Sequence, residues 1–275
     1  MGKFYLNRKS TTVDKGIIMT NTALITGASA GIGTEFARYH ASLGGDLVIA
    51  ARRKTTLTAL KKELESAHGV KVHVITTDLG KPGGAKSLYD AVKKAGIRID
   101  ILINNAGFGE QGLHTDHDLS RELGMIDLNV KSLVELSHSF ARDMIAQGGG
   151  KILNVGSTAG MMPGPNQAVY FATKAYVNSY SQAIDEELRD KGITCTVLVP
   201  GYVETEFAAV AGLEGVPMTK NGATASSVAK VGYDGMLKGK LVVFNELKLN
   251  IALNYIIPFL PRRIVLRMMR KMQSK

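Results

Sequence analysis

Tyr170 and Lys174 stand four residues apart in the segment YFATK, whose surroundings read as a helix. Four residues make about one helical turn, so the phenol and the ammonium would lie on the same helix face. A free tyrosine has a pKa of about 10, and a neighbouring ammonium favours the phenolate and lowers that pKa. Such a tyrosine could act as a general acid or base. Taken alone, the spacing is more often a packed tyrosine ring beside a solvated lysine.

Two polar residues earlier in the chain could complete a reactive group. Ser157 closes the apolar run ILNVGS, and Asn129 lies in MIDLNVKS, within a long helical segment. Reduction of a ketone leaves an alkoxide that must gain a proton. Tyr170 would supply that proton, and Ser157 would donate a hydrogen bond to the substrate oxygen and fix its orientation. Each residue alone also fits a structural role, as a turn serine or a buried helix amide.

The elements that would position these residues alternate between two patterns. Six short apolar runs rich in β-branched residues read as buried strands: 22–27, 46–51, 71–77, 99–105, 150–157 and 193–201. Amphipathic stretches separate them, such as residues 55–69, which end at the helix-stopping Gly69. Strands that are apolar on both faces belong in a sheet covered on both sides. The pattern predicts an α/β fold, a doubly wound parallel sheet of about seven strands with helices on both faces, and residues 240–244 as the seventh strand.

A glycine-rich loop, TGASAGIG at residues 26–33, follows the first strand and opens the first helix. Gly27 would allow a tight exit from the strand, while Gly31 and Gly33 would let the backbone approach a pyrophosphate. The helix N-terminus would add amide donors and a partial positive charge. The loop therefore predicts a dinucleotide site at the carboxyl ends of the strands.

The spacing T-G-x-x-x-G-x-G, followed by the Asn-Ser-Tyr-Lys set, resembles the short-chain dehydrogenase/reductase family over residues 21 to 244. The resemblance implies a single-domain Rossmann enzyme that moves hydride between a nicotinamide cofactor and a carbonyl or alcohol. It also implies four catalytic residues. Lys174 would hold the nicotinamide ribose and Asn129 would anchor a water that links Lys174 to solvent. The catalytic set is Asn129, Ser157, Tyr170 and Lys174.

The second strand ends in VIAARR, with Ala51 where NAD-preferring relatives place an acid. A carboxylate would repel a 2′-phosphate, whereas a guanidinium binds one through paired, charge-assisted hydrogen bonds. We therefore expect NADP(H), with Arg52 as the main phosphate ligand, Ser29 as an added hydroxyl and Arg53 as a second ligand or a solvated surface residue.

The resemblance implies further cofactor contacts. Asp78 would bind the adenine amine, the NNAG turn at 104–107 would line the adenine ring, and Thr205 would contact the nicotinamide carboxamide. The expected cofactor-binding residues are Gly27, Ser29, Gly31, Ile32, Gly33, Arg52, Arg53, Asp78, Leu79, Asn105, Ala106, Gly107, Tyr170, Lys174, Pro200, Gly201, Val203 and Thr205.

The sequence gives less information about the substrate than about the cofactor. The expected lining residues are mostly apolar, with no evident carboxylate clamp: Phe108, Met161, Met162, Tyr202 and Phe207. We expect a hydrophobic ketone or aldehyde, or its alcohol, under a small-residue lid at 208–224. Two alternatives stay open: a non-catalytic NADP(H)-binding regulatory protein, and a sugar-nucleotide epimerase or dehydratase. The intact catalytic set argues against the first, and the glycine spacing together with the absence of a larger C-terminal substrate domain argues against the second.

The formal charge of +10 concentrates at the two ends of the chain. We expect a flexible basic leader at 1–20 with Met19 as an alternative start, a catalytic domain at 21–244, and a basic helical extension at 245–275 broken around Pro258 and Pro261. A near-neutral body with basic ends does not predict a nucleic-acid surface. The extension predicts either packing on the body or at a subunit interface, or peripheral contact with an anionic membrane.

The cysteine and histidine content bears on the cellular compartment and on metal binding. The one cysteine, Cys195, lies in an apolar strand and reads as a buried residue in a cytoplasmic protein. The sequence HTDH at 114–117 lacks a third ligand, so no metal site is expected and these histidines read as solvated. A small-molecule substrate and a homodimer or homotetramer are the expected partners.

Overall fold

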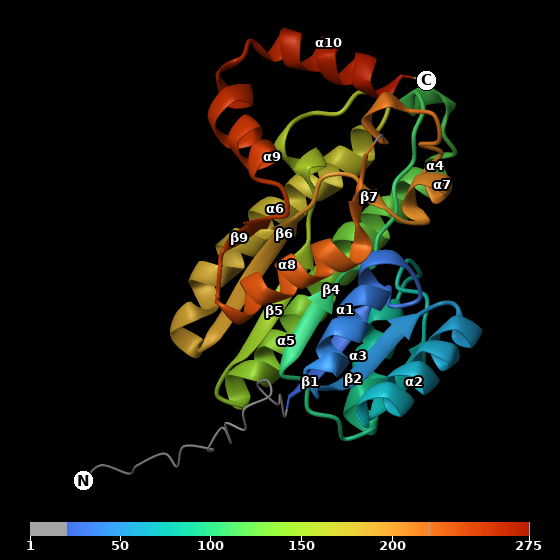
Figure 1. Cartoon of the computed structure of the whole chain (residues 1–275), viewed down its shortest axis with the longest axis vertical. Coiled ribbons are helices and arrows are strands. Elements are labelled where there is room, and N and C mark those ends of the chain that lie inside the picture. Colours follow the sequence, from blue (N-terminus) through green and yellow to red (C-terminus); the bar gives the residue numbers. More distant parts are fainter. Residues whose placement is uncertain (1–20, 220, 275) are drawn as a thin grey trace.

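In a computed structural model, which describes residues 21–219 and 221–274, seven parallel strands form one sheet (Figure 1). Their order across the sheet is β3-β2-β1-β4-β5-β6-β9. The bounds are β1 Thr22–Thr26, β2 Asp46–Ala51, β3 Val72–Thr76, β4 Ile101–Asn104, β5 Gly150–Val155, β6 Ile193–Val199 and β9 Val242–Phe244. The predicted fold class and all seven predicted strands are confirmed, with slightly shorter bounds. The expected leader at 1–20, with Met19, lies outside the described residues.

Helices cover both faces of this sheet because successive strand residues point to opposite sides. Ile25 packs with one buried cluster, under α1, α2 and α8, and its neighbour Leu24 packs with the other, under α3, α5 and the end of α6. The helix bounds are α1 Gly31–Ser42, α2 Lys54–His68, α3 Gly84–Lys94, α4 Leu119–Ile126, α5 Leu133–Ala146, α6 Ala168–Leu188, α7 Phe207–Val210 and α8 Ala225–Leu237. Gly69 ends α2 in the left-handed conformation, as predicted.

The strand order reverses between β1 and β4, because β1 pairs with β2 on one side and β4 on the other. Crossovers from these two strands therefore leave toward opposite faces, and a crevice opens between them at the carboxyl ends. A small second sheet, β7 Val203–Glu204 with β8 Ala223–Thr224, lies beyond the end of β6 and is not evident from the sequence pattern.

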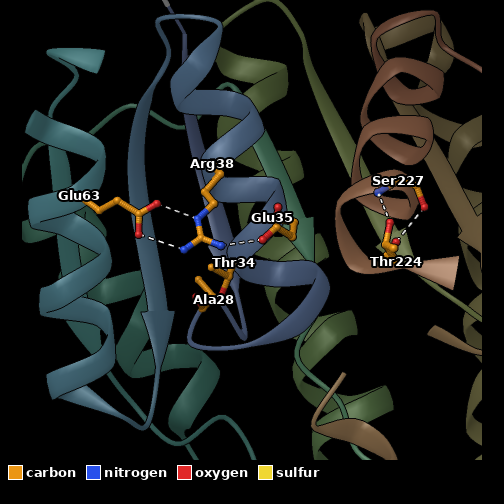
Figure 2. Close-up of polar contacts among 7 residues, drawn as sticks. All are labelled: Ala28, Thr34, Glu35, Arg38, Glu63, Thr224 and Ser227. Carbon is orange, nitrogen blue, oxygen red and sulfur yellow. Dashed lines mark hydrogen bonds and ion pairs between the residues drawn. The ribbon is translucent and has the colours of Figure 1, made fainter. Parts of the chain in front are cut away.

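Short polar contacts fix the helices that surround the crevice (Figure 2). Arg38 of α1 reaches Glu63 of α2 through two guanidinium nitrogens and also bonds Glu35. Thr34 donates to the carbonyl oxygen of Ala28 at 2.9 Å, which braces the glycine loop against the first turn of α1. The arginine contacts are partly exposed, so each contributes about 0.2–1 kcal/mol to stability and serves mainly to set helix orientation.

The C-terminal extension forms the predicted pair of helices. α9 Leu247–Ile251 continues through a π-helical turn and a 3₁₀ turn to Phe259, and α10 spans Arg262–Gln273. Pro258 and Pro261 flank the break, since proline cannot continue a hydrogen-bonded helix. In Figure 1 both helices lie at one end of the molecule, with α10 running from α9 toward α4 and α7. Across the described ranges, no helix combines the length and the apolar character needed to cross a bilayer.

Candidate active site

One cavity of about 400 Å³ lies at the carboxyl ends of the central strands. It is lined by Ser157, Tyr170 and Lys174 and by every expected cofactor residue except Gly33. Gly33 and Asn129 lie directly behind the wall. A β-carbon added at Gly33 would lie 2.4 Å from the carbonyl oxygen of Gly27. One at Gly107, a lining residue, would lie 3.0 Å from the side-chain oxygen of Asn129. The tertiary structure therefore brings the predicted residues together.

Tyr170 and Lys174 share one face of α6, one turn apart. The Lys174 Nζ lies 5.9 Å from the centre of the Tyr170 ring and donates a hydrogen bond of 2.8 Å to the carbonyl oxygen of Val155 at the end of β5. Both side chains are buried, at 8% and 6% exposure. This lysine is therefore anchored to the sheet and not solvated.

Burial shifts the pKa values of this pair in opposite directions. It raises the pKa of Tyr170 to about 12, against a smaller lowering by a hydrogen bond to Ser157, and it lowers the pKa of Lys174 to about 8. The net shift of the Tyr170 pKa in the protein alone is therefore upward, opposite to the expected lowering. Both groups are desolvated, and desolvation disfavours the charged form of each. At neutral pH, Tyr170 holds its proton and can donate it.

Ser157 is positioned by an asparagine that the sequence analysis missed. Asn178 donates from its amide to the carbonyl oxygen of Ser157 at 2.9 Å and accepts from the Ser157 backbone N–H at 3.4 Å. The Ser157 hydroxyl accepts from the Ala159 backbone N–H at 3.0 Å. Asn178 follows Lys174 by one helical turn and therefore lies on the same helix face as Tyr170 and Lys174. That spacing could have identified Asn178 from the sequence as part of the site.

Asn129 lies in a π-helical turn, Asp127–Ser132, between α4 and α5. Its amide donates to the carbonyl oxygen of Phe108 at 2.9 Å and to the Thr173 hydroxyl at 3.1 Å, and its oxygen accepts from the Phe108 N–H. Both amide donors are thus used inside the protein. A water bound at Asn129 would have to donate to an oxygen of that residue. Such π turns recur at functional sites because the extra residue re-aims a side chain.

The glycine loop has the backbone geometry that its sequence predicts. Gly27 and Gly31 have positive φ values of 67° and 55°, which side-chain-bearing residues rarely adopt. A β-carbon at Gly31 would lie 2.9 Å from a methyl carbon of Thr205, so the loop and the segment after β6 approach closely. The expected dinucleotide fits here: the lining is bare backbone at the N-terminus of α1, where amide donors face an anion.

The two arginines after β2 differ in their contacts. The Arg53 guanidinium donates to the Ser29 hydroxyl at 3.2 Å and to the Ser29 carbonyl oxygen at 2.7 Å, and it pairs with Glu206 at 2.9 Å. Arg53 is an exposed residue, but its guanidinium is held by these contacts. Arg52 also lines the cavity. Arg53 joins the glycine loop to the residue preceding α7, across the cavity mouth.

The turn after β4 is tied to β1. The Thr26 hydroxyl accepts from the backbone N–H groups of Asn105 and Ala106 at 3.0 and 3.1 Å, and the Asn105 amide donates to the Thr26 carbonyl oxygen at 2.9 Å. Asn104 points the other way, to Ser137 and Asn154 in the core. Asp78 lines the cavity and accepts from the Gly80 N–H at 3.1 Å.

The substrate side differs from the prediction at two methionines. Phe108, Tyr202 and Phe207 line the cavity, but Met161 and Met162 do not. The Met161 sulfur accepts from Asn178, and Met162 packs against the cluster around Tyr170. The short helical turn after Ser157 carries both side chains outside the wall. Residues not singled out from the sequence line the wall as well: Gln167, Phe171, Val210, Leu213 and Thr219.

The histidines of HTDH are paired with carboxylates. His114 lies 2.8 Å from Glu122, and His117, whose side chain is 6% exposed, lies 3.0 Å from Glu110. Burial lowers the pKa of His117, but the hydrogen bond to Glu110 raises it, and the net shift is upward. The interpretation of His117 as a solvated surface residue is therefore wrong. Cys195 is buried as predicted, and burial raises the pKa of its thiol.

Comparison with known proteins agrees with the family resemblance of the sequence. The family model of short chain dehydrogenases matches residues 21–213. Sulfoacetaldehyde reductase 2 of Chromohalobacter salexigens is 37% identical over 194 residues, 70% of this chain and 76% of that protein. The human very-long-chain 3-oxoacyl-CoA reductase is 32% identical over 195 residues, 68% of this chain and 61% of that protein. A short-chain dehydrogenase from Sphingobium yanoikuyae in complex with NADPH superposes with a TM-score of 0.80 at 30% identity, covering 93% of this chain and 98% of that one. The chain belongs to the short-chain dehydrogenase family, whose members are oxidoreductases of CH–OH and C=O groups.

Proposed function

We propose that the protein reduces a hydrophobic ketone or aldehyde, or oxidises the corresponding alcohol, with NADP(H) as the cofactor. The observation that carries the proposal is the shared cavity, in which Ser157, Tyr170 and Lys174 face one end and the glycine loop with Arg53 forms the other. A non-catalytic NADP(H)-binding protein would need only the second end.

The preference for NADP(H) rests on charge at the end of β2. Ala51 leaves no carboxylate there, and Arg52 and Arg53 both line the cavity. Guanidinium groups bind phosphate through paired, charge-assisted hydrogen bonds. In this proposal Arg53, already directed at Ser29, is the primary 2′-phosphate ligand and Arg52 assists. The Sphingobium relative, in complex with NADPH, supports this choice.

In the mechanism the bound nicotinamide supplies or accepts hydride. Ser157 donates a hydrogen bond to the substrate oxygen and holds it beside Tyr170. Tyr170 gives its proton to the developing alkoxide, and its raised pKa keeps that proton available at neutral pH. The Lys174 ammonium stabilises the resulting phenolate, and Lys174 would also hold the nicotinamide ribose. Asn129 and Asn178 fix the backbone on either side of this group.

The substrate class follows from the wall of the cavity. Phe108, Tyr202 and Phe207 line it together with the apolar side chains of Val210 and Leu213. The named relatives are reductases of different compounds, sulfoacetaldehyde and very-long-chain 3-oxoacyl-CoA. A sulfonate calls for a cation at the substrate end, and among the lining residues the cations are Arg52, Arg53 and Lys174, all assigned here to cofactor or catalysis. The lining therefore favours an uncharged carbonyl compound.

We further propose a catalytic domain at 21–244 with 245–275 as an extension, a cytoplasmic location, and a homodimer or homotetramer built through α4–α5 and α6. A groove between α5 and α6 supports the last point, since Ile145 and Tyr176 line it with more than a third of their surface exposed. Sedimentation velocity on the wild type and on Tyr176→Glu tests the assembly. A monomeric wild type would contradict it. Peripheral membrane contact is a separate proposal, because it rests on the extension and not on the cavity.

Fluorescence titration with NADPH and NADH tests the cofactor, using the wild type, Arg53→Ala and Arg52→Ala. We expect NADPH to bind more tightly than NADH, and Arg53→Ala to remove most of that difference. A screen of carbonyl compounds, with Tyr170→Phe as the inactive control, then tests the reaction. Cofactor binding without turnover of any carbonyl or alcohol would favour the regulatory alternative.

A further inference from the structure

The C-terminal arm, residues 247–273, exposes large apolar side chains at four-residue intervals. Along its first half the exposed fractions are 73% for Leu247, 46% for Ile251, 71% for Tyr255 and 82% for Phe259. Four residues make about one turn, so these side chains form a row on one side. On the other side Leu253 is buried, and Ala252 and Ile257 are half-buried. A helix that only packed on the body would not place its largest apolar groups in water.

The second helix of the arm, α10, carries three parallel rows. Val265, Met269 and Gln273 are buried, and the first two belong to the same apolar cluster as Tyr170 and Phe171. Ile264, Met268 and Met272, each one residue earlier, are exposed.

The third row of α10 is cationic. Arg263, Arg267 and Lys271 are exposed and border the exposed apolar row. A row of cations beside a row of exposed apolar side chains is the pattern of a helix that lies in a membrane interface.

The charge of the arm points to the kind of partner. From residue 247 to 274 the basic residues are Lys248, Arg262, Arg263, Arg267, Arg270 and Lys271, and that stretch contains no aspartate or glutamate. Within the described part of the chain, none of the α10 cations forms an ion pair. Pairing the arm with the arm of a second copy would set cations against cations. An anionic bilayer supplies both an apolar layer and the opposite charge.

We propose that the C-terminal arm docks on an anionic lipid bilayer. Phe259, Ile264 and Met268 enter the interface, and Arg263, Arg267 and Lys271 contact the headgroups. Val265 and Met269 keep their places against the cluster around Tyr170, so a single helix separates the membrane from the active site. The proposal does not depend on the reaction, because it rests only on the exposed residues of the arm.

Co-sedimentation of the full chain with vesicles tests this docking. We compare vesicles of phosphatidylcholine alone with vesicles of equal parts phosphatidylcholine and phosphatidylglycerol. Binding is expected only to the anionic vesicles, and high salt should weaken it. Each basic residue near an anionic surface contributes roughly fivefold to partitioning, so R263Q/R267Q/K271Q should lose about a hundredfold. F259S/I264S should also lose binding.

Matched controls separate the arm from general surface properties. Leu119→Ser removes an exposed apolar side chain on α4, and K61Q/K62Q removes surface cations on α2; both variants should bind like the wild type. Retained melting temperature and NADPH titration in each arm variant show that the fold is intact. Absent binding to anionic vesicles, or equal binding by the triple arginine–lysine variant, overturns the proposal. So does a wild-type dimer that F259S/I264S converts to monomer without any vesicle binding, since the arm would then be a subunit contact.

Discussion

The Nζ of Lys174 donates a 2.8 Å hydrogen bond to the carbonyl oxygen of Val155, at the last residue of β5. The bond crosses from α6 to the sheet and holds a buried ammonium beside Tyr170. It joins the strand that delivers Ser157 to the helix that delivers the tyrosine. Together with the bonds from Asn178 to Ser157, this contact fixes the geometry of the predicted catalytic set.

Lys174→Met should abolish activity and stabilise the fold at neutral pH. Burial lowers the pKa of Lys174 to about 8, below its ordinary value of 10.5. The unfolded chain therefore binds a proton more readily between those values, and wild-type stability rises with pH across that window. We expect the variant to gain about 1–3 kcal/mol at pH 7, after the loss of one hydrogen bond. Urea unfolding at pH 7 and pH 10 measures this; an unchanged pH dependence in the variant would contradict it.

Tyr170→Phe should remove the proton donor while keeping the ring in its apolar cluster. We expect kcat to fall by about 10²–10⁴, with a much smaller change in NADPH affinity, because the phenol oxygen is the only atom lost. Steady-state kinetics and NADPH titration on the same preparation measure both. Retention of wild-type kcat would remove Tyr170 from the mechanism.

Glu206→Gln should tighten NADPH binding without changing NADH binding. Glu206 pairs with Arg53 at 2.9 Å across the cavity mouth, so it competes with a 2′-phosphate for that guanidinium. Both side chains are about half exposed, and such pairs are worth about 0.2–1 kcal/mol, which corresponds to a gain of up to about fivefold. Glu214→Gln, at another exposed glutamate that does not pair with Arg53, is the control. Equal effects on both nucleotides would place the phosphate elsewhere.

His40 should make the fold sensitive to mild acid. It is wholly buried in hydrogen-bonding contact with Tyr233 and the Asp46 carbonyl oxygen, and burial lowers its pKa to about 4 from 6.5. The native state resists protonation that the unfolded state accepts. Stability present above pH 6.5 is therefore lost as the pH falls toward 4, by about 2–3 kcal/mol. Urea unfolding at pH 7.5 and 5 should show less of this loss in His40→Gln than in the wild type or the exposed control His68→Gln.

Gly33→Ala should disrupt the glycine loop. Its added carbon would lie 2.4 Å from the Gly27 carbonyl oxygen and 2.5 Å from the Asn105 amide. Neither group can move freely, so we expect a cost of about 1–3 kcal/mol and loss of NADPH binding. Gly124→Ala in α4 meets nothing closer than 3.7 Å and should be neutral or stabilising, by up to about 1 kcal/mol. Thermal melts and NADPH titration of the two variants make the comparison.

The sequence by itself determined the parallel sheet, the glycine loop and the residues proposed as the catalytic set. These features are local patterns in the sequence: apolar runs, glycine positions and the Tyr170–Lys174 spacing. A strand repeats every two residues and a helix every 3.6 residues, so such patterns predict strands and helices directly. Parallel strands all end at one edge of the sheet, so residues such as Ser157 that follow strands had to meet there.

Only the tertiary structure decided contacts between segments distant in the chain. Arg53 rather than Arg52 reaches Ser29, His117 pairs with Glu110, and Met162 does not line the cavity. These contacts depend on which of several similar side chains finds a partner once the helices and strands have packed. The periodicity of the sequence does not specify that choice. The same holds for the C-terminal arm, which the sequence predicted only as a basic helical extension. Packing of Val265 on the cluster around Tyr170 decided which row faces the protein and which remains exposed.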